Sequence, residues 1–248
     1  MPLDGLTACV LVLNDEYYLP NALEATRGYI NRYVIYDVGS TDGTKNIIQW
    51  FKESNKDAEF FIRDFEEIPP RQVQGVFRNS MIAEAGTPWY LILDGDEVYD
   101  KESLGSLCTH WNSVRPNTES GKYYGVFRRI EFSPDLTHYY SNIRTHHRIY
   151  TREATFGGPH PGEWAVIKQN PRTEVDIPFV KCFHFHNTLR SSKESEALKR
   201  DERKLQKTYH PGDLLPFNLL DAVPLLRKPI ADFPVAPALR KLQDEYIV

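Results

Sequence analysis

The chain is predicted to adopt an α/β fold in which a mainly parallel central sheet is flanked by helices. Three observations lead to this prediction. Apolar segments of strand length alternate with helical stretches over the first 100 residues. Small and acidic residues follow where two of these apolar segments end, at Asp37 and at Asp94. The 248 residues are 41% hydrophobic, 12% aromatic and 26% charged, a composition typical of a globular protein with a hydrophobic core.

Apolar runs and turn residues place the elements of the first 100 residues. Strands are expected at residues 6–13, 31–37, 58–62 and 88–93. Helices are expected between them, at residues 16–28, 43–54 and 72–86. Residues 64–70 contain three acids and two prolines and are expected to form a loop on the ligand side of the third strand.

The remaining residues predict shorter, mixed elements and a wrapping tail. A short helix is expected from Asp100 to about Val114, then strands at 122–132, 142–150, 164–168 and 178–186 and a charged helix at 190–208. Six prolines between residues 211 and 237 predict a tail of turns and short helices, because proline breaks helix interiors. We find no linker and predict one domain over residues 1–248, organised as a first half (1–100), a smaller mixed-strand half (101–190) and a C-terminal helix and tail (191–248).

The most distinctive motif is Asp94-Gly95-Asp96, which directly follows the apolar run 89–93. Carboxylates this dense repel one another unless water, a cation or a basic partner stabilises them. Oxygen ligands at the end of a rigid strand suit a hard divalent ion that keeps positions open for phosphates. The alternative interpretation is an acidic turn that caps the next helix.

A second motif runs from Asp37 to Thr44 and follows another apolar strand. Gly39 and Gly43 allow a tight turn or close approach of a ligand, and the three residues between them are good helix-capping residues. Ligands of open α/β sheets collect at the carboxyl ends of the strands. Asp37 therefore lies where a nucleotide base or ribose could be recognised, although an ordinary capped turn would have the same sequence.

With these motifs, residues 7 to about 100 resemble the nucleotide-sugar half of family 2 glycosyltransferases, which have the GT-A (Rossmann-like) fold. The matching segments, in order, are Leu11–Glu16, Asp37–Thr44, Arg78-Asn79 and Asp94–Asp96. Val38 departs from the pattern, since the family often has a second Asp there. The resemblance implies a metal-dependent, inverting transfer of a sugar from a nucleotide-diphosphate donor to a hydroxyl of a glycan or glycoconjugate. UDP is the first choice for the nucleotide of the donor.

The resemblance also implies roles for individual residues. Asp37 would hydrogen-bond the base, and Arg78 would lie near the diphosphate or brace the acidic motif. Asp94 would contact ribose or metal-bound water, and Asp96 would bind Mn²⁺ or Mg²⁺ directly. The complete set expected to bind the nucleotide sugar is Leu13, Asn14, Glu16, Asp37, Gly39, Arg78, Asp94, Gly95 and Asp96.

Two histidines of the second half are candidates for further metal ligands. His184 and His186 follow an apolar run, and alternate residues of a strand project to one face, so both imidazoles could converge on one ion. Two core or edge histidines are the alternative interpretation. Because several metal-dependent GT-A enzymes use a late histidine as an extra ligand, the resemblance favours the metal, and we prefer His184 as the ligand.

The acceptor hydroxyl requires a base, for which we select Glu163. It follows a loop shaped by glycine and proline, with His160 and Trp164 beside it. Related enzymes often carry an acid here, but two extra residues separate His160 from Glu163 in this chain. Asp135 is the reserve candidate. Arg148 is expected to reach a phosphate or to lie on the surface.

Bulk properties narrow the function classes. A net charge of −4 argues against general nucleic-acid binding, although basic residues between 193 and 207 leave peripheral membrane contact open. No apolar run approaches the ~20 residues of a membrane-spanning helix, and the N-terminus lacks the pattern of a secretory signal. Three cysteines without metal spacing predict reduced thiols and a cytoplasmic location.

Three other function classes stay open at this point. Nucleotidyltransferases share this type of sheet but usually carry a glycine-rich loop after the first strand, where this chain has Asn14-Asp15-Glu16. A non-catalytic nucleotide- or sugar-binding module would bind UDP without turning over a donor. A metallohydrolase built on the histidines is the weakest alternative.

Overall fold

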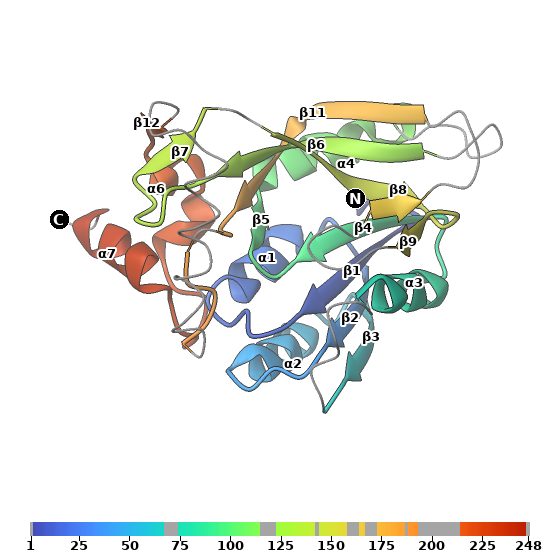
Figure 1. The fold of residues 1–248 in the computed structure, drawn as a ribbon, viewed down its shortest axis with the longest axis horizontal. Coiled ribbons are helices and arrows are strands. Elements are labelled where there is room, and N and C mark those ends of the chain that lie inside the picture. Colours follow the sequence, from blue (N-terminus) through green and yellow to red (C-terminus); the bar gives the residue numbers. More distant parts are fainter. Residues whose placement is uncertain are drawn as a thin grey trace.

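The computed structural model describes residues 2–66, 74–114, 123–141, 144–157, 164–166, 173–186, 188–192 and 214–246. It has the predicted α/β architecture, a curled and mostly parallel sheet flanked by helices (Figure 1). The first elements are β1 (Leu6–Val12), α1 (Leu19–Thr26), β2 (Arg32–Asp37), α2 (Thr44–Ser54), β3 (Glu59–Asp64), α3 (Gln74–Ala85), β4 (Trp89–Asp94), β5 (Glu97–Tyr99) and α4 (Lys101–Val114). The next are β6 (Tyr123–Glu131), β7 (His138–Tyr140), β8 (Arg144–Thr151), β9 (Thr155–Gly157), β10 (Trp164–Val166), β11 (Thr173–His184), β12 (Leu214–Pro216), α6 (Leu219–Ala222), the 3-10 helix η4 (Pro224–Arg227) and α7 (Pro237–Tyr246).

The main sheet has eight strands in the order β3-β2-β1-β4-β8-β6-β11-β5. Strands β3, β2, β1 and β4 are parallel, and β8 is antiparallel to both of its neighbours, β4 and β6. Strand β11 is parallel to β6 and antiparallel to β5. Since β5 directly follows the motif Asp94-Gly95-Asp96, its pairing with β11 brings the second half of the sequence to the end of β4.

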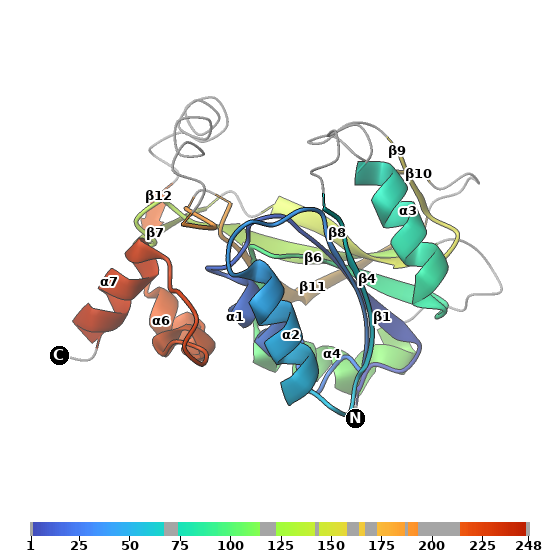
Figure 2. The ribbon, with the colours of Figure 1, turned by 90° about the horizontal axis from the view of Figure 1, so that it is seen from below.

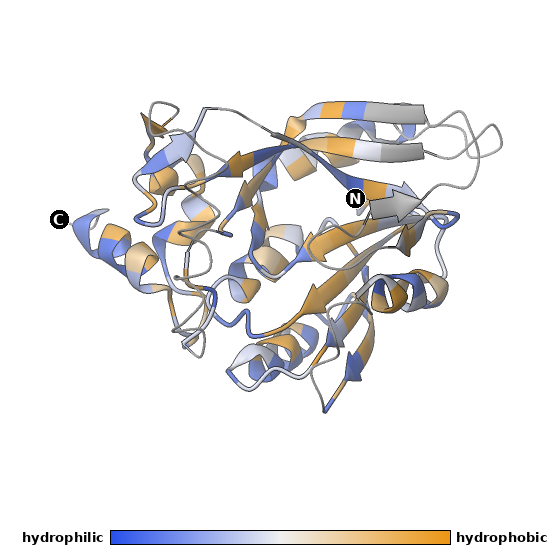
Figure 3. Cartoon of the chain, in the orientation of Figure 1, coloured by the Kyte–Doolittle hydropathy of each residue, from blue (hydrophilic) through white to orange (hydrophobic). Residues whose placement is uncertain are grey.

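The central strands contribute to two cores, one on each face of the sheet. On β1, Ala8 and Val10 belong to the core that contains α1, α2 and α4, whereas Cys9 belongs to the core that contains α3. This division follows from the two-residue period of a strand. Figure 2 shows α3 on the face opposite to α1, α2 and α4. Figure 3 shows the hydrophobic colours concentrated on β1 and β4, the strands buried from both faces.

The proline-rich tail packs against the core that contains α1 and α2. Leu226 of η4 and Leu239 of α7 are buried in this core. The ring of Phe233 lies 5.2 Å from that of Trp50 on α2, edge to face. The side chain of Gln243 donates to the Leu226 carbonyl oxygen at 2.8 Å, which fixes α7 on η4.

Element boundaries differ from the predictions by a few residues, and very short strands were not predicted. Strand β5 (Glu97–Tyr99) lies where only an acidic turn was expected. Strand β11 begins at Thr173, earlier than the expected residue 178. Residues 190–192 of the expected charged helix are not helical, and residues 193–208 lie outside the described part of the chain.

Two of the three cysteines are buried. Cys9 and Cys182 are free thiols inside the fold, and burial raises the pKa of Cys9 to about 12. Such thiols are poor nucleophiles because little thiolate forms. Among the described residues, no helix combines the length and the apolar character that crossing a bilayer requires.

Candidate active site

The carboxyl ends of β1, β2 and β4, with residues 13–16, 37–44 and 94–96, form what we call the donor edge. Side-chain hydrogen bonds join the turns that follow β1 and β2. Asn14 has a left-handed φ of 54°, which asparagine adopts more readily than most residues. Its amide N–H donates to Ser40 Oγ at 2.9 Å, and its Oδ1 accepts from the Thr41 N–H at 2.8 Å. The two turns therefore hold each other in place.

Glu16 links three segments of the chain. Its Oε2 accepts from the Gly43 N–H at 2.8 Å, and its Oε1 accepts from the Ser192 N–H at 2.9 Å. The hydroxyls of Ser192 and Ser191 also donate to Oε1. Both carboxylate oxygens are thus used within the protein, so Glu16 shapes the edge, and direct contact with a donor stays a prediction.

Asp37 has one oxygen engaged and one open. Its Oδ1 accepts from the Ser40 N–H at 2.7 Å and from the Gly39 N–H at 3.1 Å. Gly39 has a φ of 99°, a conformation that glycine adopts without strain. Asp37 Oδ2 is buried without a hydrogen-bond partner among the described residues. Burial raises the pKa of Asp37, although the bonds from Ser40 act in the opposite direction. An unsatisfied buried acceptor is costly, so this oxygen suits a ligand that brings a donor.

Gly95 is required because the acidic motif packs directly on Asp15. A Cβ added to Gly95 would lie 2.6 Å from Asp15 Cβ and 2.7 Å from Asp15 Oδ2. The Asp15 carboxylate is itself fixed, because its Oδ2 accepts from the Leu13 N–H at 3.1 Å. The predicted site residues Leu13 and Gly95 therefore act through the backbone in this structure.

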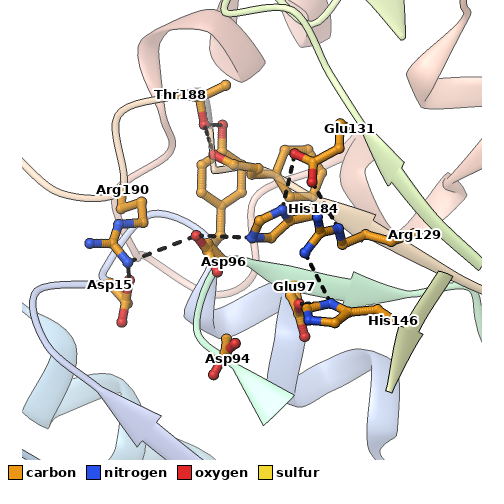
Figure 4. Close-up of polar contacts among 12 residues, drawn as sticks. Asp15, Asp94, Asp96, Glu97, Arg129, Glu131, His146, His184, Thr188 and Arg190 are labelled. Atoms are coloured by element: carbon orange, nitrogen blue, oxygen red, sulfur yellow. Dashed lines mark hydrogen bonds and ion pairs between the residues drawn. The ribbon is translucent and has the colours of Figure 1, made fainter. Parts of the chain in front are cut away.

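Next to the donor edge lies a buried set of ionic groups that we call the charge network. It comprises Arg78, Asp94, Glu97, Arg129, Glu131, His146 and Arg148, several of which are shown in Figure 4. Asp94 accepts from Arg78 Nη2 at 2.9 Å and from Arg148 Nη2 at 2.8 Å. Burial opposes ionisation of Asp94, but Arg148 and Arg78 hold its pKa well below the usual range. Asp94 is therefore an ionised carboxylate at the end of β4.

The charge network continues through β5, β8 and β6. Glu97 is fully buried and accepts from Arg148. Burial opposes its ionisation, yet Arg148 lowers the pKa of Glu97 to about 2. His146 Nδ1 lies 3.5 Å from Glu97 Oε1 and 3.1 Å from Arg129 Nη1. Arg129 Nε in turn lies 2.8 Å from Glu131 Oε1. Because each of the three acids lies against an arginine, the charges compensate one another inside the fold.

Asp96, His184 and His186 converge as the sequence predicted. Each offers one ligand atom, and the three atoms all lie within 4.8 Å of one another. Asp96 Oδ2 and His184 Nε2 are 3.6 Å apart, and the two imidazole rings stack with centroids separated by 5.3 Å. Ligands about 2.1 Å from one ion can be up to roughly 4.2 Å apart. The group therefore fits a divalent cation after small side-chain adjustments.

The other nitrogen of His184 faces Glu131. His184 Nδ1 lies 3.1 Å from Glu131 Oε2, an ion pair when the ring is protonated. Burial alone would lower the pKa of His184, but Glu131 and Asp96 raise it to about 9. Burial likewise opposes ionisation of Glu131, while His184 and Arg129 lower its pKa to about 2.

Arg190 brings a positive charge to the same place. Its Nη1 lies 3.4 Å from Asp15 Oδ1 and 3.8 Å from Asp96 Oδ2 (Figure 4). The Tyr17 N–H donates to the Arg190 carbonyl oxygen at 2.9 Å, which anchors this segment on the turn after β1. The sequence analysis did not select Arg190, because it read this residue as the start of a charged helix at 190–208.

Of the two candidate bases, Asp135 lies in the described part of the chain and Glu163 does not. Asp135 lies in the turn between β6 and β7, where its Oδ1 accepts from Ser133 Oγ at 2.5 Å and from the Thr137 N–H at 3.2 Å. Glu163 and His160 lie outside the described residues. The choice between Glu163 and Asp135 thus stays a prediction.

The sequence analysis expected Arg148 to reach a phosphate or to lie on the surface, and it did not foresee the ion pairs of this residue. Arg148 is 6% exposed and pairs with Asp94 and Glu97, so it is neither a surface residue nor open to a phosphate. Arg129 and Glu131 were also missed. Their signal is a pair of opposite charges at alternate positions, 129 and 131, of a predicted strand, which places both on one face.

Comparisons with known proteins identify the family and the fold of the chain. The model of the family described as glycosyl transferase family 2 matches residues 7–169. No curated protein matches the chain. Among solved structures, mannosyltransferase PcManGT from Pyrobaculum calidifontis, in complex with GDP-Man and Mn²⁺, has a TM-score of 0.53 at 15% identity, covering 97% of this chain and 68% of that chain. This similarity shows that the two share a fold.

Two other structures are more distant. Glucosyl-3-phosphoglycerate synthase from Mycobacterium tuberculosis, with Mn²⁺, UDP-Glc and phosphoglyceric acid, has a TM-score of 0.44 at 14% identity, covering 71% of this chain and 70% of that chain. TarS residues 1–349 from S. aureus with UDP-GlcNAc has a TM-score of 0.40 at 20% identity, covering 53% and 35%. Across four TarS structures, the matched part covers only 28 to 47% of the TarS chain.

Proposed function

Because the chain belongs to glycosyl transferase family 2, we propose that it is a metal-dependent, inverting glycosyltransferase. It would move a sugar from a nucleotide-diphosphate donor to a hydroxyl of a glycan or glycoconjugate. We propose UDP as the nucleotide of the donor. One observation carries the proposal: three potential ligands, Asp96, His184 and His186, converge within 4.8 Å beside the donor edge.

The donor set favours a particular cation. Asp96 supplies a carboxylate oxygen, and His184 and His186 supply imidazole nitrogens. Mg²⁺ prefers oxygen ligands, so the two imidazoles favour Mn²⁺. When bound, the ion would act as a Lewis acid that neutralises the charge growing on the departing diphosphate.

The donor edge would orient the nucleotide. Asp37 Oδ2 is a buried acceptor without a hydrogen-bond partner among the described residues. Both uracil and guanine carry ring N–H donors that could bond to it. Arg78 and Arg148 hold Asp94 ionised and in one orientation, so that this carboxylate can accept from a ribose hydroxyl or a water molecule. Arg190 adds a cation within reach of the same region.

Inversion requires a base on the face of the sugar opposite to the diphosphate. We propose Glu163 for this role, with Asp135 in reserve. A base acts only in the chemical step, so Glu163→Gln should lower turnover by ~10²–10⁴ while nucleotide and metal binding stay near normal. Measuring sugar transfer and donor binding for Glu163→Gln and Asp135→Asn side by side identifies the base. Full transfer by Glu163→Gln would move the role to Asp135 or another acid.

The proposal is tested by measuring thermal stabilisation of the protein with UDP, GDP, dTDP and CMP, each with and without Mn²⁺. A nucleotide at 100 times its Kd should stabilise the fold by ~2.7 kcal/mol. We expect the largest shift with UDP plus Mn²⁺ and a much smaller one after EDTA is added. GDP is the principal alternative, since PcManGT is in complex with GDP-Man.

Turnover separates the remaining function classes. Release of UDP from a UDP-sugar together with a glycosylated acceptor supports the proposal. Tight UDP binding with no turnover of any donor would favour a binding module, and pyrophosphate release from a nucleoside triphosphate would favour a nucleotidyltransferase. Cytoplasmic location and peripheral membrane contact stay predictions from the sequence.

A further inference from the structure

We propose that Glu131 is a positioning residue that orients His184 for metal binding, and this inference rests on the proposed function. Glu131 matches none of the motifs that carry the family resemblance, and it follows Arg128, Arg129 and Ile130 at the end of β6. Its side chain nevertheless faces one of the candidate ligands from the side opposite to Asp96 (Figure 4).

The sheet register brings Glu131 and His184 together. In the parallel pair β6–β11, His184 lies opposite Glu131, and in the antiparallel pair β11–β5 it lies opposite Glu97. Neighbours in register across strands contact each other directly. The last residue of β11 is therefore placed between two buried acids by backbone hydrogen bonding.

The contacts give the two ring nitrogens of His184 separate tasks. Nδ1 lies 3.1 Å from Glu131 Oε2, and Nε2 lies 3.6 Å from Asp96 Oδ2. A histidine that binds a metal commonly donates its other ring N–H to a carboxylate, which fixes the tautomer and the ring orientation. With the Nδ1 proton facing Glu131, an ion that replaces the proton on Nε2 would meet this nitrogen on the side of Asp96 and His186.

Glu131 is itself held in one orientation. It is 3% exposed, and its other oxygen, Oε1, lies 2.8 Å from Arg129 Nε. Arg129 continues to His146 at 3.1 Å. Because a carboxylate fixed in this way cannot reach an acceptor sugar from inside the sheet, it acts through His184 and is not the catalytic base.

The test measures the Kd of Mn²⁺ alone by isothermal titration calorimetry on the full chain. Glu131→Leu should weaken Mn²⁺ binding by ~10- to 100-fold, the usual cost of removing such a partner. Glu131→Gln should weaken it less, because the amide oxygen still accepts the Nδ1–H. Glu84→Gln is the matched control. Glu84 also pairs with an arginine, Arg63, and accepts from Tyr36 Oη at 2.6 Å, but it lies outside the site, so this variant should bind Mn²⁺ normally.

The decisive comparison repeats both changes in a His184→Ala background. If Glu131 acts through His184, its replacement should cause no further loss there. A further loss of tenfold or more in that background would make Glu131 an independent ligand and overturn the inference. If Glu131→Leu does not fold, Glu131→Gln carries the same comparison. If both Glu131 variants bind Mn²⁺ with wild-type affinity while His184→Ala binds it more weakly, the inference is overturned and the proposed metal site stands. Wild-type affinity in His184→Ala would instead remove the proposed metal site.

Discussion

The donor edge and the charge network meet at Asp94, which belongs to both, but the two regions are built differently. At the donor edge, Asp37 accepts from backbone groups two and three residues later, and Asn14 joins the same turn to the turn after β1. In the charge network, Arg148 bonds to Asp94 and Glu97, which are 54 and 51 residues away in sequence. The donor edge leaves an acceptor open on Asp37, whereas each acid of the network faces a base.

This difference separates recognition from support. A ligand can bond to polar groups that lack a hydrogen-bond partner at a strand end. Replacing such a group should change ligand affinity more than the stability of the fold. Buried ions that compensate one another depend on every partner, since removing one leaves an uncompensated charge. Mutations in the two regions should therefore have different readouts.

The largest effect is expected from Arg148→Met. This change removes the arginine that Asp94 and Glu97 share and leaves Asp94 with Arg78 alone, and losing one member of such a group costs ~3–5 kcal/mol. The free energy of unfolding in urea measures the loss. Arg63→Met is the control, since Arg63 pairs with Glu84 in an exposed position (51% side-chain exposure) and should cost at most ~1 kcal/mol. Equal losses in both variants would mean that the network does not stabilise the fold as proposed.

The next effect is expected from Asp96→Asn, which keeps the size of the side chain and removes its charge. Mn²⁺-dependent UDP binding should largely vanish while the fold persists, because the variant removes the anionic member of the proposed ligand group. Calorimetric titration of UDP with and without Mn²⁺ measures this. Asp100→Asn is the control, because Asp100 Oδ2 accepts from the Ser103 N–H at 2.9 Å and asparagine caps a helix equally well. Unchanged metal-dependent UDP affinity in Asp96→Asn would contradict the metal assignment.

A smaller and more selective effect is expected at Asp37. Asp37→Ala should weaken UDP by ~1–3 kcal/mol, the range for losing a partner of a buried polar group. Asp37→Asn sharpens the comparison, because its oxygen can keep the bonds to Gly39 and Ser40 while an NH₂ replaces the open oxygen. If both variants lose affinity equally for every nucleotide, Asp37 shapes the turn and does not read the base.

The donor edge was largely predictable from the sequence because its signals are local. A strand that ends in Asp37 or Asp94 and is followed by small residues can be read without knowledge of the fold. The alternation of His184 and His186 predicted that both would face one ligand, and the structure brings them to Asp96. These predictions required only the strand period and the rule that ligands collect at the carboxyl ends of strands.

The charge network was not predictable in this way. Burial of Arg148 depends on partners that the sequence separates widely, so a sequence reader expects a surface residue. The pairing of β11 with β5 was missed because three residues, Glu97–Tyr99, are too few to show a period. This pairing sets His184 opposite Glu97, and the pairing of β11 with β6 sets it opposite Glu131.

The smallest effect is expected from the pH dependence of the network. Burial, reinforced by Arg148, lowers the pKa of His146 to about 4, although Glu97 acts in the opposite direction. The unfolded chain takes up this proton near pH 6.5, so the fold loses stability as the pH falls from about 6.5 toward 4. One pKa unit corresponds to ~1.4 kcal/mol. The His146 side chain is 27% exposed, so solvent screening reduces the free energy that this pKa difference contributes.

We therefore expect a loss on the order of 1 kcal/mol between about pH 6.5 and 5. His146→Gln should remove this loss, because glutamine does not titrate and its amide oxygen can still accept from Arg129. Urea unfolding of both proteins at the two pH values isolates the contribution, since all other titrating groups are shared. The same pH dependence in both proteins would show that His146 is not held neutral inside the network. Asp37→Asn, a change at the donor edge, should leave the loss that His146 contributes in place. If it removed that loss as well, the two regions would not be independent.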